Sequence, residues 1–208
     1  MKLERREDRC VADSDRGVFL VASEIGWHSG RAEASEILAR VLPDWLAATA
    51  KCAWRDVDLI ESAVADAVDA ARREMIAFAQ TNPHFSRMAA TMAFAVVVDR
   101  TLYVTCVGNC RAYLLHRDRL QRLSKDRLAD VVGVEPLGEA ISVDAFELGE
   151  VNRLLLCSEG LTDSVSDGEL QHFLRLGECP QTSADALVNV AVKNGTHNDV
   201  TCVVVDLA

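Results

Sequence analysis

The sequence contains no long apolar run, no closely paired cysteines and no cluster of basic residues. No stretch of about 18 or more apolar residues occurs, and residues 1–9 are charged with no apolar stretch behind them, so we expect neither a membrane span nor a secretory signal. Lysine and arginine adjoin only in pairs, and the formal net charge is −10. Because phosphate backbones are bound by clustered basic side chains, we expect no nucleic-acid partner. The charge favours a protein partner or a cationic ligand, although most of the excess acid is typical of a solvated surface.

The cysteine pattern indicates a reducing compartment. The seven cysteines are odd in number and form no CxxC pair, which favours buried thiols in a cytoplasmic protein over a disulfide framework or a zinc site. The chain has 208 residues, of which 50% are hydrophobic and 26% charged. This length suits one sizeable core, so we predict a single domain spanning residues 1–208.

Apolar periodicity predicts two strands and two long helices in the first half of the chain. Residues 8–12 and 17–22 have the pattern of short apolar strands joined by a turn. Residues 29–50 have the pattern of an amphipathic helix that Pro43 bends or interrupts. Residues 56–80 predict a longer helix that ends before Pro83.

Strand patterns dominate after this point. The predicted strands are residues 90–98, 102–107, 112–115 and 120–123, a further strand pair at 141–147 and 153–157, and a closing strand at 200–205. Two helices, at residues 168–176 and 183–193, precede the closing strand. This order predicts an α+β fold, and the short connections favour antiparallel sheets.

Four short segments carry polar residues in a recognisable order. They are residues 21–28 (VASEIGWH), 107–111 (VGNCR), 155–163 (LLCSEGLTD) and 198–201 (NDVT). In order and spacing they resemble the (V/A)DGMGGH, VGDSR, LCSDGL and DN(I/V)T motifs of the type 2C metal-dependent serine/threonine protein phosphatases, the PPM family. The resemblance runs from Asp8 to Val205. It implies two stacked antiparallel sheets, each covered by helices on its outer face, in a four-layer α-β-β-α sandwich.

The resemblance also implies a metal centre, and here the sequence departs from the family. Such phosphatases hold two manganese or magnesium ions that share a bridging water, and hard cations of this kind need anionic oxygens. The family's four aspartates correspond to Ser23, Asn109, Glu159 and Asn198. Three formal negative charges are lost, and neighbouring unit charges interact by about 4 kcal/mol even at an effective dielectric constant near 20. The sequence therefore predicts no catalytic centre and no bound metal.

Several acids stand beside the replaced positions. A relocated metal set would comprise Asp8, Glu24, Glu159 and Asp199, but adjacent side chains on a strand point to opposite faces, so a shift by one residue should turn a carboxylate away. Asp8 and Arg9 resemble the family's N-terminal motif, in which the arginine binds the substrate phosphate. The alternative is a surface ion pair at a strand start.

Two further departures concern the edge of the site. Trp27 replaces a motif glycine and would crowd the backbone turn, so a packing or capping role for His28 is preferred to catalysis. Only residues 127–136 separate the segment SKD from the later LG, whereas bacterial members carry a longer insertion with a mobile flap. The flap is therefore predicted to be deleted.

The sequence thus predicts a catalytically inactive, phosphatase-like signalling domain without a cofactor. It would act as a regulatory or scaffolding module that binds another protein, such as a phosphoprotein, a kinase or an assembly component, and neither nucleic acid nor membrane. The alternative is a weak phosphoserine/phosphothreonine protein phosphatase that uses manganese or magnesium in an altered site.

Overall fold

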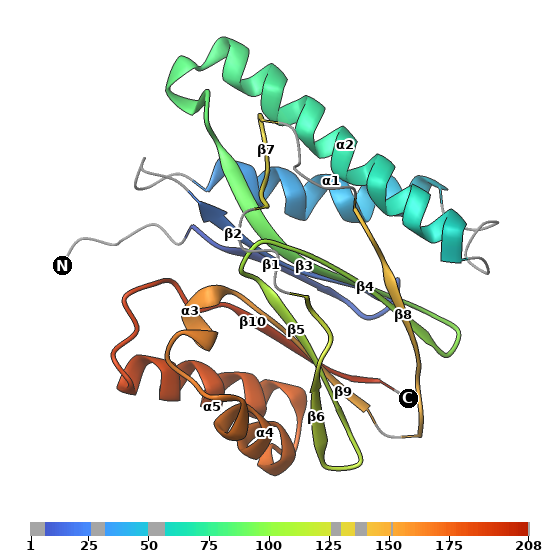
Figure 1. Cartoon of the computed structure of the whole chain (residues 1–208), viewed down its shortest axis with the longest axis vertical. Coiled ribbons are helices and arrows are strands. Elements are labelled where there is room, and N and C mark those ends of the chain that lie inside the picture. The colour runs from blue at the N-terminus through green and yellow to red at the C-terminus, as the bar shows by residue number, and fades with distance from the viewer. Residues whose placement is uncertain are drawn as a thin grey trace.

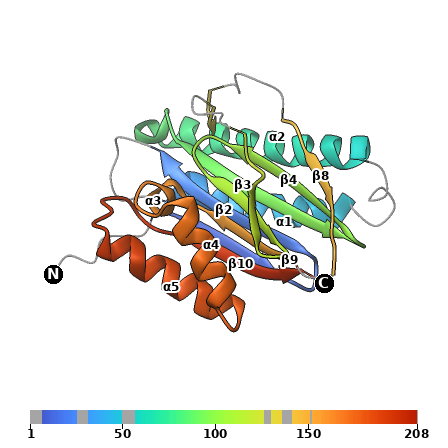
Figure 2. The ribbon, with the colours of Figure 1, turned by 60° about the horizontal axis from the view of Figure 1, so that its bottom comes forward.

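The protein is a sandwich of two antiparallel sheets between two layers of helices (Figure 1). The computed structural model describes residues 7–25, 32–49, 57–125, 130–135, 141–150 and 152–207. Seen from a second direction, the helices of the first half and those of the second half lie on opposite outer sides of the paired sheets (Figure 2). The predicted α+β class and the four-layer arrangement are confirmed.

Sheet 1 contains six strands in the order β1-β2-β3-β4-β8, with β7 pairing β3. The strands are β1 (Arg9–Asp13), β2 (Val18–Ile25), β3 (Ala89–Val98), β4 (Thr101–Val107), β7 (Val132–Gly133) and β8 (Asp144–Glu147). Sheet 2 has the order β10-β9-β5-β6. Its strands are β5 (Arg111–His116), β6 (Arg119–Arg122), β9 (Asn152–Cys157) and β10 (Cys202–Leu207).

Helices cover the outer face of each sheet. The helices are α1 (Glu33–Thr49), α2 (Val57–Thr81), the short 3₁₀ helix η1 (Pro83–Phe85), α3 (Glu159–Thr162), α4 (Asp167–Leu176) and α5 (Pro180–Lys193). The first two pack on sheet 1, and α3 to α5 pack on sheet 2. Within the described parts of the chain, no helix is both long and apolar enough to cross a bilayer.

The alternation of β2 separates two of the cores. Leu20 and Ala22 face α1 and α2, whereas Phe19 and Val21 face the second sheet. Successive side chains of a strand point to opposite faces, so Ser23, at the end of β2, belongs to the side between the sheets. This one-residue alternation decides which motif residues can meet there.

One sequence prediction about the elements was wrong. Residues 141–147 and 153–157 do not form a strand pair, because β8 pairs with β4 in sheet 1 and β9 pairs with β5 and β10 in sheet 2. Pro43 lies inside α1 and does not interrupt it, and the bend expected at Pro43 stays a prediction. Strand β7 and the short helices η1 and α3 were not predicted, because elements of two to four residues carry almost no periodicity.

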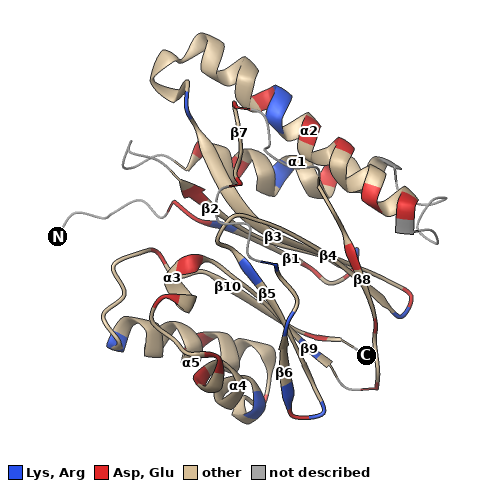
Figure 3. Cartoon of the chain, in the orientation of Figure 1, with Lys and Arg blue, Asp and Glu red and all other residues tan. Residues whose placement is uncertain are grey.

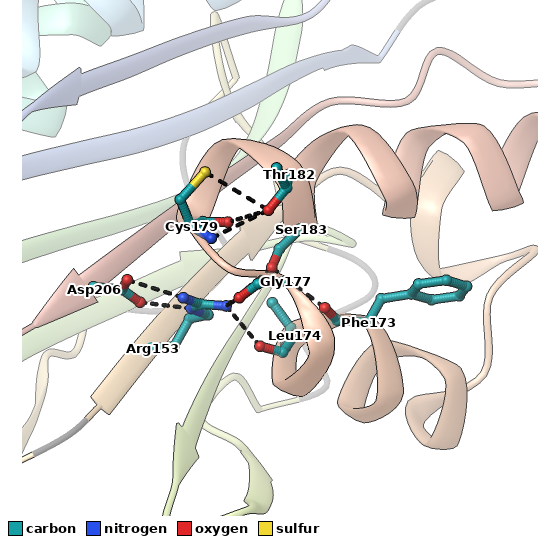
Figure 4. A network of polar contacts seen from close by, with 8 residues as sticks. All are labelled: Arg153, Phe173, Leu174, Gly177, Cys179, Thr182, Ser183 and Asp206. Carbon is teal, nitrogen blue, oxygen red and sulfur yellow. Dashed lines mark hydrogen bonds and ion pairs between the residues drawn. The ribbon is translucent and has the colours of Figure 1, made fainter.

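A partly buried guanidinium fixes the C-terminal helices to sheet 2 (Figure 4). Arg153, on β9, forms a bidentate ion pair with Asp206 at 2.5 and 2.9 Å. Its Nη1 atom also donates to the carbonyls of Leu174 and Gly177 at 2.7 and 2.9 Å and to Ser183 Oγ at 3.0 Å. One side chain therefore satisfies carbonyls at the end of α4 and ties both helices to β9 and β10.

Candidate functional site

A buried carboxylate marks one end of the space between the sheets. Asp8 directly precedes β1 and lies opposite Ser23 by the register of β1 and β2. Asp8 is only 8% exposed, and the hydroxyls of Ser23, Thr201 and Ser158 lie close to its carboxylate. Burial raises the pKa of Asp8 above its ordinary value, and the nearby charge of Asp199 raises it further, while the three hydroxyls oppose the shift. Asp8 is therefore not the surface ion pair that the sequence left open.

Asp199 faces the same end of the sheets. The backbone N–H of Glu7 donates to Asp199 Oδ2 at 2.8 Å, although the two residues are 192 positions apart. The expectation that a one-residue shift would turn this carboxylate away was wrong for Asp199. The alternation rule applies to strands, and Asp199 lies in the loop before β10, which begins only at Cys202.

The same rule holds for Glu24. Its carboxylate accepts a hydrogen bond from the backbone N–H of Ala34 and interacts with Glu33, on the side of sheet 1 covered by α1. Arg9 is on this side too, because it pairs with Ala22 in register and forms an ion pair with Glu36 at 3.3 Å. Glu24 therefore does not join the Asp8 site, and the phosphate-binding role of Arg9 stays a prediction.

Two replaced motif positions bind each other. Asn109 Nδ2 donates to Glu159 Oε1 at 2.7 Å, which joins the loop before β5 to the first residue of α3. Gly108 adopts a φ of +75°, a conformation that glycine adopts without steric cost, and this turn positions Asn109. Asn109 Oδ1 is buried and has no hydrogen-bond partner in the described structure.

The side chain of Asn198, the fourth replaced position, is directed to Asp163. Asn198 is exposed and donates to Asp163 Oδ2 at 3.2 Å. His28 and Trp27 lie outside the described residues, as do Arg127 and part of the shortened segment. The predictions for these residues, including the deleted flap, therefore remain predictions.

A buried thiol close to Asp8 and Glu159 stays protonated at neutral pH. Cys110 is 1% exposed, its Sγ lies 3.3 Å from Thr91 Oγ1, and burial raises its pKa to about 12. A protonated thiol is a poor nucleophile, so the site offers no cysteine nucleophile. The prediction of buried thiols holds for Cys110 and Cys157, whereas Cys10 and Cys179 are exposed.

The described residues contain two unpartnered oxygens near this site but no complete set of metal ligands. Asp8 Oδ2 and Asn109 Oδ1 are both buried without a hydrogen-bond partner among the described residues, and such oxygens suit a hard cation. Yet no group of three or more His, Cys, Asp or Glu side chains in the described residues is placed to hold a metal ion. A bound ion would therefore rely on Asp8 and Asp199 with neutral oxygens and water. Ser23 provides no carboxylate to bridge a pair of ions.

The sequence did not single out the hydroxyls that hold Asp8. Ser158 and Thr201 each lie inside a recognised motif: Ser158 directly precedes Glu159, and Thr201 ends the NDVT segment. Ser158 N–H donates to the carbonyl of Thr201 at 2.9 Å, and Thr201 N–H donates to Ser158 Oγ at 3.0 Å. These bonds join the residue after β9 to the residue before β10, and the neighbouring motif residues were the only signal for the two hydroxyls.

Two antiparallel sheets covered by helices on their outer faces are the architecture of the type 2C phosphatase fold. The family described as Stage II sporulation protein E (SpoIIE) matches residues 45–208. The chain belongs to this SpoIIE and type 2C serine/threonine phosphatase family.

Similar proteins carry phosphatase names. The serine/threonine phosphatase stp of Listeria innocua is 24% identical over 217 residues, covering 91% of this chain and 84% of the relative. The catalytic domain of the serine/threonine protein phosphatase PstP, solved with two manganese ions, superimposes with a TM-score of 0.82 at 21% identity and covers 100% of this chain and 94% of that one. PppA, described as a regulatory component of the type VI secretion system in Pseudomonas aeruginosa, gives a TM-score of 0.82 at 20% identity, covering 97% and 91%. These structural likenesses concern the fold.

Proposed function

We propose that this chain is a weak, metal-dependent phosphoserine/phosphothreonine protein phosphatase with an altered metal site. The observation that carries the proposal is the buried Asp8 carboxylate, whose Oδ2 has no partner in the described structure and which lies beside Asp199. A fold retained only for protein binding has no need for a costly unpaired buried oxygen. Relatives that cover most of this chain are named as phosphatases, which supports the same function.

A manganese or magnesium ion at this position would neutralise phosphate charge and make water a better nucleophile. Asp8 and Asp199 would hold the ion, with Asn109 Oδ1 as a neutral donor. Glu159 stays in place through its hydrogen bond to Asn109, and the amide of Glu7 orients Asp199.

We expect weak activity because few negative charges would surround the ion. Ser23 and Asn198 supply no negative charge, and Asn198 is turned to Asp163. With only two carboxylates beside the ion, both metal affinity and the stabilisation of the transition state should be lower than in a centre built from four aspartates.

A second candidate is the inactive, protein-binding domain that the sequence predicted. This candidate is favoured by the neutral residues Ser23 and Asn198 and by the lack, in the described part of the chain, of three acidic, histidine or cysteine side chains placed to hold a metal ion. Such a domain would hold a phosphoprotein, a kinase or an assembly component without hydrolysis. The two candidates differ in whether manganese promotes turnover.

The test is hydrolysis of p-nitrophenyl phosphate and of a phosphothreonine peptide, each with manganese and with chelator. The proposal expects slow turnover that rises with manganese, disappears with chelator and falls to background in Asp8→Asn. Glu178→Gln, an exposed acid on another surface, is the matched control and should retain the wild-type rate.

A variant with the family's four aspartates restored distinguishes the two candidates if the wild-type protein shows no turnover. Ser23→Asp, Asn109→Asp, Glu159→Asp and Asn198→Asp introduced together should raise manganese-dependent turnover, because ligands of one centre act as a unit. If this variant is active while the wild-type protein shows no metal-dependent turnover, the phosphatase proposal is wrong and the binding domain is correct.

A further inference from the structure

A cavity of about 240 Å³ lies beside the Asp8 site, at the end of sheet 1. The end of β2, the start of β3, strand β7 and helix η1 surround it. Register pairs β2 with β3 and β3 with β7 at this end, which brings Ile25, Ala89 and Gly133 together. Glu7 lines the cavity while its backbone N–H holds Asp199, so the cavity and the site are neighbours with separate linings.

The charged residues of the lining are mostly acidic. Glu7, Glu24 and Glu135 line the cavity, against one permanent cation, Arg87, and the titratable His84. Acidic residues lie at the end of β2 and around β7 (Figure 3). A cavity with this charge balance repels phosphate and other anions and attracts cations.

One of these acids has an unused acceptor deep in the structure. The carboxylate of Glu24 accepts a hydrogen bond from the backbone N–H of Ala34, but its Oε2 is buried and unpartnered among the described residues. Glu33, which interacts with Glu24, likewise has a buried Oε2 without a described partner. Burial, reinforced by the charge of Glu33, raises the pKa of Glu24 to about 8, which marks it as the most perturbed acid of the lining.

The rest of the lining is apolar. Ile25, which is 41% exposed, Phe85 and Met88 contribute hydrocarbon surface. The volume is below the range of about 300–1,000 Å³ typical of small-molecule sites, which suits one long side chain. Apolar walls with acids favour a cationic head on an aliphatic stem, because such side chains pack their stems on apolar surface.

We propose that this cavity binds an arginine side chain of a partner protein. A guanidinium carries five donors in a planar fork that matches carboxylates, so it can pair with the acids of the lining while its stem packs on Met88 and Phe85. A metal ion is a poorer occupant, since no group of three ligating side chains is placed for one among the described residues. The chain's net charge of −10 favours a basic partner. The inference does not depend on phosphatase turnover and applies equally to a protein-binding domain.

The experiment is isothermal titration calorimetry of the full chain in chelator, without any phosphate substrate. The probes are the blocked tripeptide acetyl-Gly-Arg-Gly-amide and its citrulline analogue, which has nearly the same shape but no charge. The arginine peptide should bind at least about tenfold more tightly than the citrulline peptide, a difference of about 1.4 kcal/mol. Equal affinity of the two peptides would overturn the proposal.

Variants locate the binding to this cavity. Glu24→Gln keeps a carbonyl oxygen for the Ala34 N–H and removes the charge, and Glu135→Gln changes another part of the lining. Each should weaken the arginine peptide about tenfold, whereas the exposed control Glu178→Gln should not. If both lining variants bind like the wild-type chain while their unfolding curves show intact folding, the arginine site lies elsewhere and the proposal fails. Tight binding of spermidine without binding of the arginine peptide would also reject it, since the occupant would be a free polyamine.

Discussion

Replacing Asp8 by asparagine should stabilise the metal-free protein near pH 8. Asp8 is 8% exposed, and burial raises the pKa of its carboxyl. A group of this kind stabilises the fold fully below its unfolded pKa, near 4, and this contribution is lost as the pH rises through the raised folded pKa. At pH 8, well above the unfolded pKa, the burial of this carboxyl therefore destabilises the wild-type protein relative to low pH. Asparagine does not ionise and can still accept hydrogen bonds from the surrounding hydroxyls.

The expected gain is about 1 kcal/mol, at the lower end of the cost of a poorly satisfied buried group. For a chain of 208 residues this raises the melting temperature by roughly 2–4 °C. Manganese should reverse the order of the two melting temperatures, so that the wild-type protein melts above Asp8→Asn. An ion at about ten times its dissociation constant adds about 1.4 kcal/mol to the wild-type protein, or roughly 3–6 °C, and adds almost nothing to Asp8→Asn.

Differential scanning calorimetry at pH 8, in chelator and in millimolar manganese, measures both effects. Glu178→Gln should follow the wild-type protein in each condition. The reasoning about the buried charge is refuted if Asp8→Asn melts below the wild-type protein in chelator. The proposed metal site is refuted if manganese raises the melting temperature of neither protein, or of both equally.

Three further predictions concern stability. Burial raises the pKa of Glu24 to about 8, so the contribution of this residue to stability should fall as the pH rises from about 4.5 to 8. Glu24→Gln should remove this pH dependence, which amounts to roughly 1–2 kcal/mol in urea unfolding after allowance for solvent screening. Arg153→Lys should cost about 2–4 kcal/mol in urea unfolding, because lysine cannot reproduce the bidentate pair and the carbonyl contacts; the exposed Arg175→Lys should cost less than about 0.5 kcal/mol. Gly108→Ala should lower the free energy of unfolding by about 2 kcal/mol or more, because φ is +75° and the new Cβ would lie 2.8 Å from a backbone carbonyl. Gly168→Ala is the control: this residue lies in α4 with nothing within 4 Å of the new Cβ, so the change should be neutral or stabilising. Equal effects of the two substitutions would contradict this account.

Long periodic elements could be predicted, and their partners could not. The apolar repeat at residues 56–80 became α2 (Val57–Thr81), and the strand at residues 102–107 became β4 (Thr101–Val107). Residues 141–147 and 153–157 were assigned to one strand pair, yet they joined different sheets. Local pattern determines that a segment is extended, whereas its partner depends on contacts between residues distant in sequence.

The candidate site shows the same division. The motifs identified the family and the positions that lack aspartate, because the order of Ser23, Asn109, Glu159 and Asn198 is readable along the chain. They could not give the direction of the neighbouring acids. Strand alternation sends Glu24 to the helix-covered side, while Asp199, in a loop, is free of that rule.

The sequence by itself determined the fold family, the net negative charge and the loss of the carboxylate that would bridge two metal ions, since each follows from residue identity and order. The tertiary structure alone decided that Asp8 is buried among three hydroxyls beside Asp199, and that Glu24 lines a separate acidic cavity. The physical reason is that Asp8 becomes buried, and its Oδ2 loses its partners, only where β1, β2, β9 and the loop before β10 come together. The pKa of each acid depends on what those distant segments place around it.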